Sequence, residues 1–279
     1  MTQVKKANGE FEQFSEDKVL SSIKRAGIPK ELQDSVLSEV KSKLYNNIPT
    51  FEIYQIIIDS LSRTEQPYAT ARYSLKQAIM LLGPTGYPFE DFVAKVLESQ
   101  GYSTQTRQVL EGRCVNHEVD VIAEKEGQKV LVEAKFHNNP GTRSDVHVAL
   151  YMKSRFEDLK DRFKFDEAWI VTNTKTTLDA NTFAYCSGLK IISWNYPEGN
   201  SLRDMIERST LHPITMLTRL SAAQKLKLLE DGIIICHDIL DKPQVLDVIG
   251  LTHEEKKDTL SELEFICKSH TPKDSLHQE

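Results

Sequence analysis

The 279-residue sequence lacks the features of membrane-spanning and secreted proteins. No apolar run approaches the roughly 20 residues that a membrane-spanning helix needs. Residues 1–6 contain no apolar stretch of the kind found in secretory signals. We therefore expect a cytoplasmic protein with no membrane partner.

Cysteine is scarce, and its spacing indicates no site. The four cysteines are widely separated and form no Cys-x-x-Cys pair; they are Cys114, Cys186, Cys236 and Cys267. Neither a disulfide framework nor a zinc cluster is indicated. We interpret them as buried or incidental thiols.

An excess of positive charge is also missing. The chain has 35 Lys and Arg residues against 41 Asp and Glu residues, a formal net charge of −6. It has no long basic stripe of the kind that indicates a nucleic-acid-binding protein. An acidic total still permits a local positive surface, and carboxylates that bind a metal lower the sum until the metal is present. If the substrate is a nucleic acid, we expect modest, salt-sensitive affinity.

A Gly-rich phosphate loop of the Walker kind is absent as well. The stretch 83–86 reads Gly-Pro-Thr-Gly but is followed by Tyr87 rather than by Lys, so nucleotide hydrolysis at such a loop is unsupported. Together with Pro88, the same stretch interrupts a helical pattern and is the best candidate for a domain boundary. We divide the chain into domains at 1–86, 87–197 and 198–279.

Two neighbouring apolar strands, 117–123 and 130–136, carry the strongest catalytic pattern and are joined by a short Gly-containing turn. Alternation along the second strand places Glu133 and Lys135 on the same face. The turn folds the first strand back and brings Asp120 alongside them. Asp120 and Glu133 are therefore candidate ligands of one divalent metal, with Lys135 beside it to orient a water or stabilise charge on a phosphate. A solvated strand face that carries acids and lysines is the plain alternative.

The order of Asp120, Glu133 and Lys135 on paired strands resembles the PD-(D/E)XK nuclease superfamily, and in particular its Mrr-like restriction endonuclease branch. The resemblance implies Mg²⁺-dependent phosphodiester hydrolysis of DNA by these three residues. Few carboxylates, completed by water and substrate phosphate, are typical of a Mg²⁺ site.

A helix expected from Pro88 to about Gln100 adds a further candidate. Its pattern Phe-Glu-x-Phe-Val at 89–93, followed by Gly-Tyr, looks like the opening helix of Mrr-type nucleases. In those enzymes the glutamate completes the metal site, which makes Glu90 a third catalytic carboxylate. The alternative is that a Glu in a first helical turn is favoured by the helix dipole whatever the function.

A long helix is expected at 142–164, after the second catalytic strand, with Val146, Leu150 and Leu159 inward. Tyr151 and Arg155 lie four residues apart and share a face, so both could contact a DNA phosphate or steady Lys135. A solvated flank is the alternative, but related nucleases place polar contacts on this helix.

Two further strands, 165–172 and 189–194, flank a helix at 178–186, which predicts a parallel pair added to the sheet. His117 and His137 bracket the catalytic strands. We interpret each as a hydrogen-bonded structural histidine, because their separation does not by itself make a zinc site.

The first 82 or so residues predict a hairpin and four helices. Asn8-Gly9 stands between two extended pieces, which is a strong hairpin signal. Ser15 is the expected N-cap of a first helix that Gly27 ends. Further helices are expected at 30–45, from Thr50, and at 66–82.

This region resembles the ATP-cone module of ribonucleotide reductases and of their nucleotide-responsive repressor. The resemblance rests on a helical pattern through 69–72 and on seven residues of the N-terminal segment: Val4, Lys6, Asn8, Gly9, Glu12, Phe14 and Lys18. It implies that the hairpin, with Lys6, Asn8, Gly9 and Lys18, binds the triphosphate of ATP or dATP as an effector. Family members commonly have a basic residue where this chain has Ala7. On spacing alone, Lys6 and Lys18 are ordinary surface lysines.

The segment 198–279 is expected to be helical. The turn 249–251 is faintly similar to helix-hairpin-helix modules, which hold DNA phosphates with backbone amides. A plain helical cap or a dimer surface is the favoured interpretation. Residues 268–279 are polar and are expected to form a disordered tail.

The whole chain is therefore predicted to be a multidomain α+β protein. A mostly helical ATP-cone with a β-hairpin precedes an α/β restriction-endonuclease-like fold with a mixed sheet, and a helical C-terminal segment follows. The predicted function is a Mg²⁺-dependent DNA endonuclease regulated by ATP or dATP. A nucleotide-sensing DNA-binding regulator with a non-cleaving nuclease fold is the alternative, and an RNA substrate remains open. Double-strand cutting would imply a homodimer, because one metal site cuts one strand.

Overall fold

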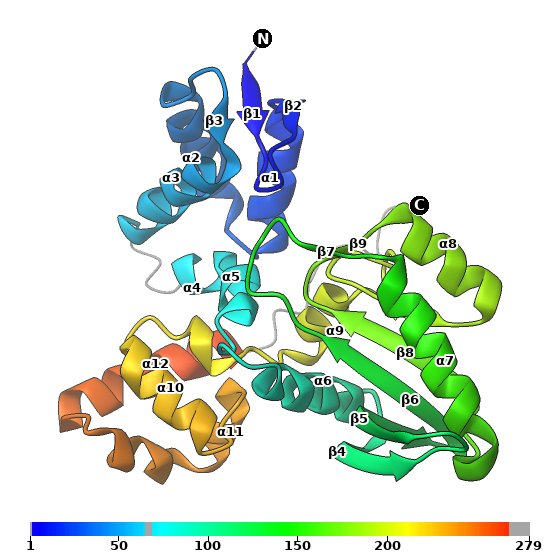
Figure 1. Ribbon diagram of the computed structural model, residues 1–279. Helices are drawn as coiled ribbons and strands as arrows, with labels where there is room; N and C mark the ends of the chain where they lie inside the picture. The colour runs from blue at the N-terminus through cyan, green and yellow to red at the C-terminus, as the bar shows by residue number, and fades with distance from the viewer. Residues whose placement is uncertain (1, 65–68, 268–279) are drawn as a thin grey trace, which may run out of the picture.

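The computed structural model describes residues 2–64 and 69–267, and Figure 1 shows their arrangement. In Figure 1 a small N-terminal unit stands at the top, the central sheet with its helices lies at the lower right, and the C-terminal helices α10–α12 (residues 222–267) lie at the lower left. This mixed α/β architecture with a helical C-terminal segment agrees with the predicted fold class. The expected disordered tail at 268–279 lies outside the described residues.

The N-terminal unit begins with the predicted hairpin. Strand β1 (Gln3–Lys5) pairs antiparallel with β2 (Phe11–Gln13), and Gly9 adopts a left-handed φ of +84° in the turn between them. Glycine suits that position because it has no Cβ to clash. The short strand β3 (Ile48–Pro49), which the sequence did not predict, pairs parallel with β1.

Three helices close this unit: α1 (Glu16–Arg25), α2 (Lys30–Ser42) and α3 (Thr50–Ser62). Ser15 caps α1 as predicted, because its side chain accepts a hydrogen bond from the backbone N–H of Lys18. The helices and strands enclose a separate apolar core, whose fully buried members are Ile23, Val36, Val40, Ile48, Ile57 and Leu61.

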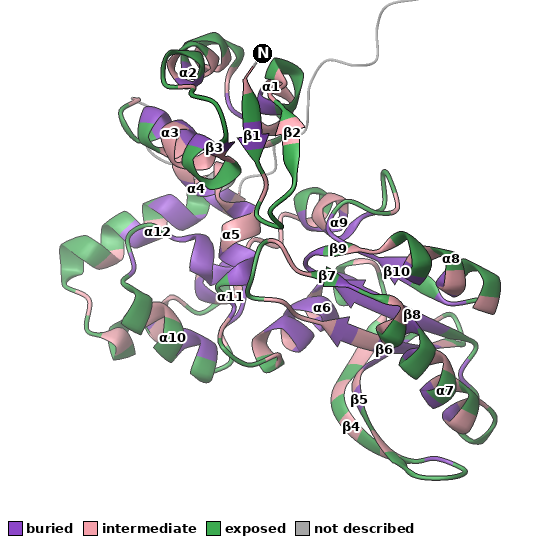
Figure 2. Ribbon diagram, turned by 45° about the horizontal axis from the view of Figure 1, so that its top comes forward, coloured by how far each residue is buried: buried purple, intermediate pink, exposed green. Residues whose placement is uncertain are grey.

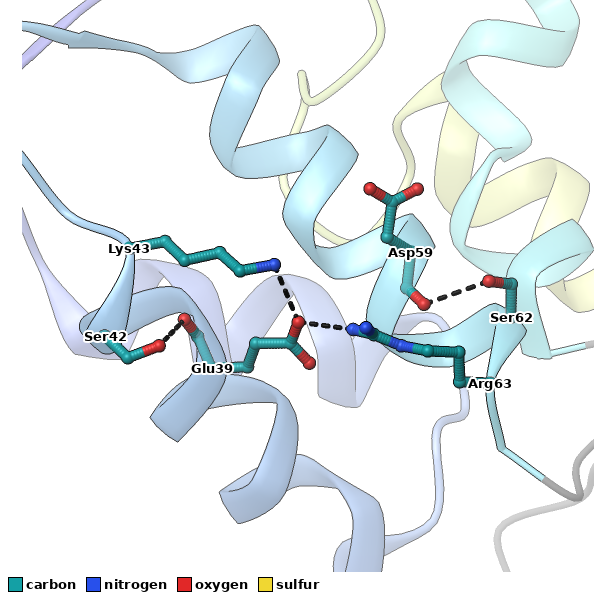
Figure 3. A network of polar contacts seen from close by, with 6 residues as sticks. All are labelled: Glu39, Ser42, Lys43, Asp59, Ser62 and Arg63. Carbon is teal, nitrogen blue, oxygen red and sulfur yellow. Dashed lines mark hydrogen bonds and ion pairs between the residues drawn. The ribbon is translucent and has the colours of Figure 1, made fainter.

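An ion-pair network ties α2 to the end of α3 (Figure 3). Glu39 of α2 accepts from Lys43, the residue that follows α2, at 2.9 Å, and also from Arg63, the residue that follows α3. Hydrogen bonds from these two cations lower the pKa of Glu39 to about 2. The network is exposed to solvent, so it orients the two helices rather than adding much stability.

The predicted helix at 66–82 is divided in two. In the described part, α4 (Ala69–Tyr73) and α5 (Leu75–Met80) are separated at Ser74. Ala69 and Tyr73 pack with the N-terminal core, whereas the apolar face of α5 packs into the core of the central domain.

The central sheet has the strand order β10–β8–β6–β5–β4. Strands β4 (Ser103–Glu111), β5 (Asn116–Lys125) and β6 (Gln128–Lys135) form an antiparallel meander. Strands β8 (Glu167–Thr172) and β10 (Lys190–Ile192) extend it in parallel from β6. The predicted parallel pair and mixed sheet are therefore present.

Helices cover both faces of this sheet (Figure 1). Helix α6 (Tyr87–Ser99) packs on one face, and α7 (Val146–Phe163) and α8 (Leu178–Ser187) pack on the other. The expectation that Leu150 of α7 points inward is wrong, because Leu150 is 43% exposed.

The buried positions of α7 are Ala149, Met152, Arg155 and Leu159. A charged residue therefore occupies a position that the apolar pattern assigned to the surface.

The segment after β6 makes a second, smaller pairing. Strand β7 (Arg143–Ser144) lies parallel to β9 (Lys175–Thr176), with Arg143 opposite Lys175. The pairing holds the end of the segment that connects β6 to α7.

The C-terminal part is helical, as predicted. It comprises α9 (Leu202–Ser209), η1 (Ile214–Met216), α10 (Ala222–Glu230), α11 (Cys236–Asp241), η2 (Pro243–Ile249) and α12 (His253–Cys267). Its apolar residues join α5, α6 and one face of the sheet in a single core. None of the helices in the described residues is long and apolar enough to cross a membrane.

Candidate active site

Asp120 lies where the strand pairing around β5 opens. Pairs between β4 and β5 are formed on both sides of it, but Arg107, the residue opposite in register, has a left-handed φ of +53°. On the other side, pairing with β6 ends at Val121 and Val132. Beyond this point the side chain of Asp120 links β5 to β6 in place of backbone pairing. Its Oδ2 accepts a hydrogen bond of 2.7 Å from the backbone N–H of Ala134.

The charge state of Asp120 is strongly perturbed. Burial, with the nearby charges of Glu133 and Glu90, raises the pKa of Asp120 to about 7, although the Ala134 N–H and Arg155 act in the opposite direction. Two carboxylates that approach each other in a poorly solvated place cannot both ionise at low cost. The hydrogen bond from Ala134 places the Asp120 carboxylate next to the position of Glu133 on β6.

Glu133 is held from α7 by Arg155. Arg155 Nη1 donates to Glu133 Oε2 at 2.5 Å, and both side chains are largely buried. The guanidinium also stacks on the ring of Tyr151, 4.7 Å from its centroid, while Tyr151 is 57% exposed. Tyr151 and Arg155 thus share a face as predicted, but Arg155 steadies Glu133 rather than Lys135.

Lys135 ends β6 on the same side of the sheet as Glu133, since alternate residues of a strand share a face. The chain directly after it is firmly held. His137 donates its backbone N–H to Asn173 Oδ1 at 2.9 Å and accepts from Asn173 Nδ2 at 2.7 Å. The buried Asn173 thereby fixes the direction in which β6 leaves the sheet.

Glu90 lies in the first turn of α6 and is buried. Its Oε2 has no hydrogen-bond partner and lies 3.6 Å from Nη1 of Arg107, which donates to Asp91 at 2.8 Å. Burial raises the pKa of Glu90 despite the opposing charge of Arg107. A buried carboxylate oxygen without a partner fits a group that awaits a cation or a proton.

The donor set of Asp120 and Glu133 fits a hard divalent cation, which prefers carboxylate oxygens. Within the described residues, however, no three side chains among His, Cys, Asp and Glu form a metal-binding group, so Glu90 does not close such a group with them. Two carboxylates with water and substrate oxygens are a usual shell for Mg²⁺.

Both histidines near β5 and β6 are hydrogen-bonded, in line with the structural role expected for them. His117 Nε2 lies 2.9 Å from Asp158 Oδ2, and His137 Nε2 lies 2.9 Å from Ser144 Oγ. Burial, together with the charge of Lys135, lowers the pKa of His137.

The candidate nucleotide residues lie on the turn of the hairpin and, for Lys18, in the first turn of α1. Lys6 and Lys18 both contact the carboxylate of Glu12. Asn8 Oδ1 accepts from the backbone N–H of Glu10 at 3.2 Å, and Gly9 donates its N–H to the Lys6 carbonyl at 2.9 Å. The hairpin and α1 therefore each place one lysine at the carboxylate of Glu12, and a phosphate chain would compete with that carboxylate.

The sequence pattern missed Arg107. Its left-handed conformation and its position opposite Asp120 follow from the strand register, and an isolated arginine in an alternating strand gives no signal of either. Asn173 could have been found from the sequence, because it is a polar residue directly after the apolar run of β8. Strand ends in α/β sheets often carry functional side chains.

Comparison with known proteins divides the chain into three matched regions. Residues 2–78 match the ATP cone domain, residues 82–203 match a restriction endonuclease domain, and residues 212–267 match the AF1548-like C-terminal domain. The three regions follow one another without overlap.

A relative from Archaeoglobus fulgidus, described as an uncharacterized protein, is 34% identical over 171 residues. The match covers 61% of this chain and 97% of the relative. The solved structure "Crystal Structure of Protein of Unknown Function AF1548" has a TM-score of 0.57 and 32% identity, and covers 66% of this chain and 98% of that one. This chain belongs to the family of these AF1548-like proteins and combines an ATP cone domain, a restriction endonuclease domain and an AF1548-like C-terminal domain.

Proposed function

We propose that this protein is a Mg²⁺-dependent DNA endonuclease whose activity responds to ATP or dATP bound at the cone. The observation that carries the proposal is the hydrogen bond from the Ala134 N–H, which holds the Asp120 carboxylate beside Glu133. Burial, together with the charge of Glu133, raises the pKa of Asp120 to about 7. A divalent cation between them would relieve this repulsion. The restriction endonuclease domain supplies the class of reaction.

Each residue has a proposed role in phosphodiester hydrolysis. Asp120 and Glu133 would hold the Mg²⁺, and the bound ion would supply an acidic water and polarise the phosphate. Lys135 orients the attacking water or stabilises charge on the phosphate. Glu90 serves as a third carboxylate, and Tyr151 with Arg155 contacts the DNA backbone while Arg155 keeps Glu133 in place.

Cleavage of supercoiled plasmid DNA with Mg²⁺ tests this site. Asp120→Ala and Glu133→Ala should abolish cleavage. The control Glu124→Ala removes an exposed carboxylate from β5, the strand of Asp120, and should leave cleavage unchanged. Thermal unfolding of all three variants checks that the fold is retained. Cleavage that survives both active-site changes would contradict the assignment.

The same assay addresses the substrate, the effector and the oligomeric state. Because the phosphodiester chemistry is shared, parallel reactions with RNA are needed to show which nucleic acid is cleaved.

Cleavage rates with and without ATP or dATP test regulation, and identical rates at saturating nucleotide would count against it. Double-strand products would support the proposed homodimer, and we place the reaction in the cytoplasm.

A second candidate function is a nucleotide-sensing DNA-binding regulator that does not cleave. It is favoured by the ion pair between Arg155 and Glu133, which already neutralises one proposed metal ligand. DNA binding that depends on ATP or dATP, without strand scission at any Mg²⁺ concentration, would select this function.

A further inference from the structure

The turn of the cone hairpin touches the endonuclease domain at the segment that follows β6. A Cβ added to Gly141 would lie 2.8 Å from the carbonyl oxygen of Ala7 and 3.0 Å from the backbone nitrogen of Asn8. Figures 1 and 2 both show the hairpin turn beside this segment. Gly141 does not have a left-handed φ, so glycine is needed here for the close approach alone.

Positive side chains of the endonuclease domain face the hairpin at this contact. Arg143 Nη2 lies 3.6 Å from Glu10 Oε2. Arg143 and Lys175 are opposite each other in the parallel β7–β9 pair, so two like charges stand side by side. A hydrogen bond from Asn8, together with the charges of Arg143, Lys6 and Lys175, lowers the pKa of Glu10.

Two further cations, Lys76 and Arg203, lie near Lys175. Burial, together with the charges of Lys175 and Arg203, lowers the pKa of Lys76 on α5. Within the described part of the chain, Lys76 has no ion-pair partner, whereas Arg203 lies 3.7 Å from both Asp204 and Glu207. The neighbouring cations repel one another, and a bound polyanion would reduce that repulsion.

We propose that Arg143 and Lys175 of the endonuclease domain form, with Lys6 of the cone hairpin, one polyphosphate-binding site that spans the two domains. The ligand class is the phosphate chain of a nucleoside triphosphate, and the inference rests on the proposed effector role of that nucleotide. The phosphates displace Glu10 and Glu12 from these cations. Charge-assisted contacts from both domains then hold the ligand.

The shared site is connected along the chain to the end of β6. Lys135, Gly141 and Arg143 belong to one segment, which Asn173 holds at His137, two residues after Lys135. A ligand that draws Arg143 towards the hairpin therefore pulls on the Asn173 contact at the end of β6. No separate relay between the domains is required.

Calorimetric titration of ATP into the full chain tests the shared site without a cleavage assay. Arg143→Gln and Lys175→Gln should each weaken ATP binding about tenfold, as expected for the loss of one charge-assisted contact. Arg143→Lys should retain most of the affinity. The matched control is Arg162→Gln, which removes an exposed arginine paired with Glu111 and should leave binding unchanged.

Two further measurements separate phosphate recognition and contact geometry. Inorganic triphosphate should show the same losses as ATP, and AMP should bind far more weakly. Gly141→Ala should weaken ATP binding because its methyl group displaces the hairpin, whereas Asn138→Ala, an exposed position of the same segment, should not. Hydrogen exchange at 136–144 should change with ATP in the wild type and not in Gly141→Ala.

The outcomes distinguish this inference from the proposed function. If the wild type binds ATP and the Arg143→Gln, Lys175→Gln double variant binds it equally well, the shared site is wrong while the effector role stands. If the wild type binds no ATP, both the effector role and the shared site are overturned. Melting temperatures of each variant show whether a lost affinity reflects lost folding.

Discussion

The protonation of a single residue, Asp120, sets the electrostatic state of the candidate active site. Its pKa of about 7 lies above the ordinary value of 3.8, because burial and Glu133 disfavour the ionised form. The folded protein therefore keeps a proton that the unfolded chain releases between about pH 4 and pH 7. Because the folded state binds more protons in this window, stability falls as the pH rises through it.

The variant Asp120→Asn removes this pH dependence. At pH 8 we expect the variant to be more stable than the wild type by about 1–2 kcal/mol, and at pH 4 we expect no difference. Urea unfolding at both pH values measures the two free energies. Mg²⁺ at pH 8 should stabilise the wild type and not the variant, and a stability difference that is the same at both pH values would contradict the argument.

At the scale of elements, the left-handed Arg107 shapes the strand pairing beside Asp120. A non-glycine residue in this conformation costs of order 1 kcal/mol and persists only where surrounding contacts impose it. Here the ion pair with Asp91 and the contact with Glu90 hold the side chain in place. The register between β4 and β5 accordingly has no pair between Arg107 and Asp120, although the pairs on either side are formed.

Two substitutions of Arg107 separate its backbone cost from its side-chain contacts. Arg107→Gly and Arg107→Ala both lose the ion pairs, but only glycine adopts the left-handed φ without strain. We expect the glycine variant to be more stable than the alanine variant by about 1 kcal/mol, measured by thermal or urea unfolding. Equal stabilities would show that the backbone at this position is unstrained.

Elements with strong local patterns were predictable, and those set by distant contacts were not. The hairpin at Asn8-Gly9 and the strand pair with Glu133 followed from turn chemistry and alternation. The inward position of Arg155 was not foreseen, because a charged residue breaks the apolar helix pattern and its buried partner, Glu133, lies on another element. The division of the predicted fourth helix at Ser74 likewise reflects packing against two cores.

At the scale of the molecule, α5 joins the N-terminal unit to the rest of the chain. Leu75, Ala78 and Ile79 are buried in the core of the central and C-terminal parts. Thr215, 137 residues further along the chain, donates its Oγ1 hydrogen to the Ala78 carbonyl at 2.6 Å. The contact of Gly141 with Ala7 is equally remote in sequence, so neither interface could be derived from local patterns.

Truncations test the role of α5. A fragment of residues 69–279 keeps the helix, whereas a fragment of residues 82–279 loses the burial of Leu75 and Ile79. Because burying each of these side chains contributes about 1.5–3 kcal/mol, we expect the shorter fragment to be less stable by about 3–6 kcal/mol. Denaturant unfolding of both fragments measures the difference, and equal midpoints would show that α5 is dispensable.

The irregular edge of the central sheet also affects how copies of the protein meet. Strand β4 is paired on one side only, and its Val109 is 70% exposed, which in a regular strand would invite another chain to add alongside it. The left-handed Arg107 turns the peptide groups in the middle of this strand out of the regular array. The same residue that opens the ladder for Asp120 therefore shortens the template available for intermolecular strand addition and aggregation.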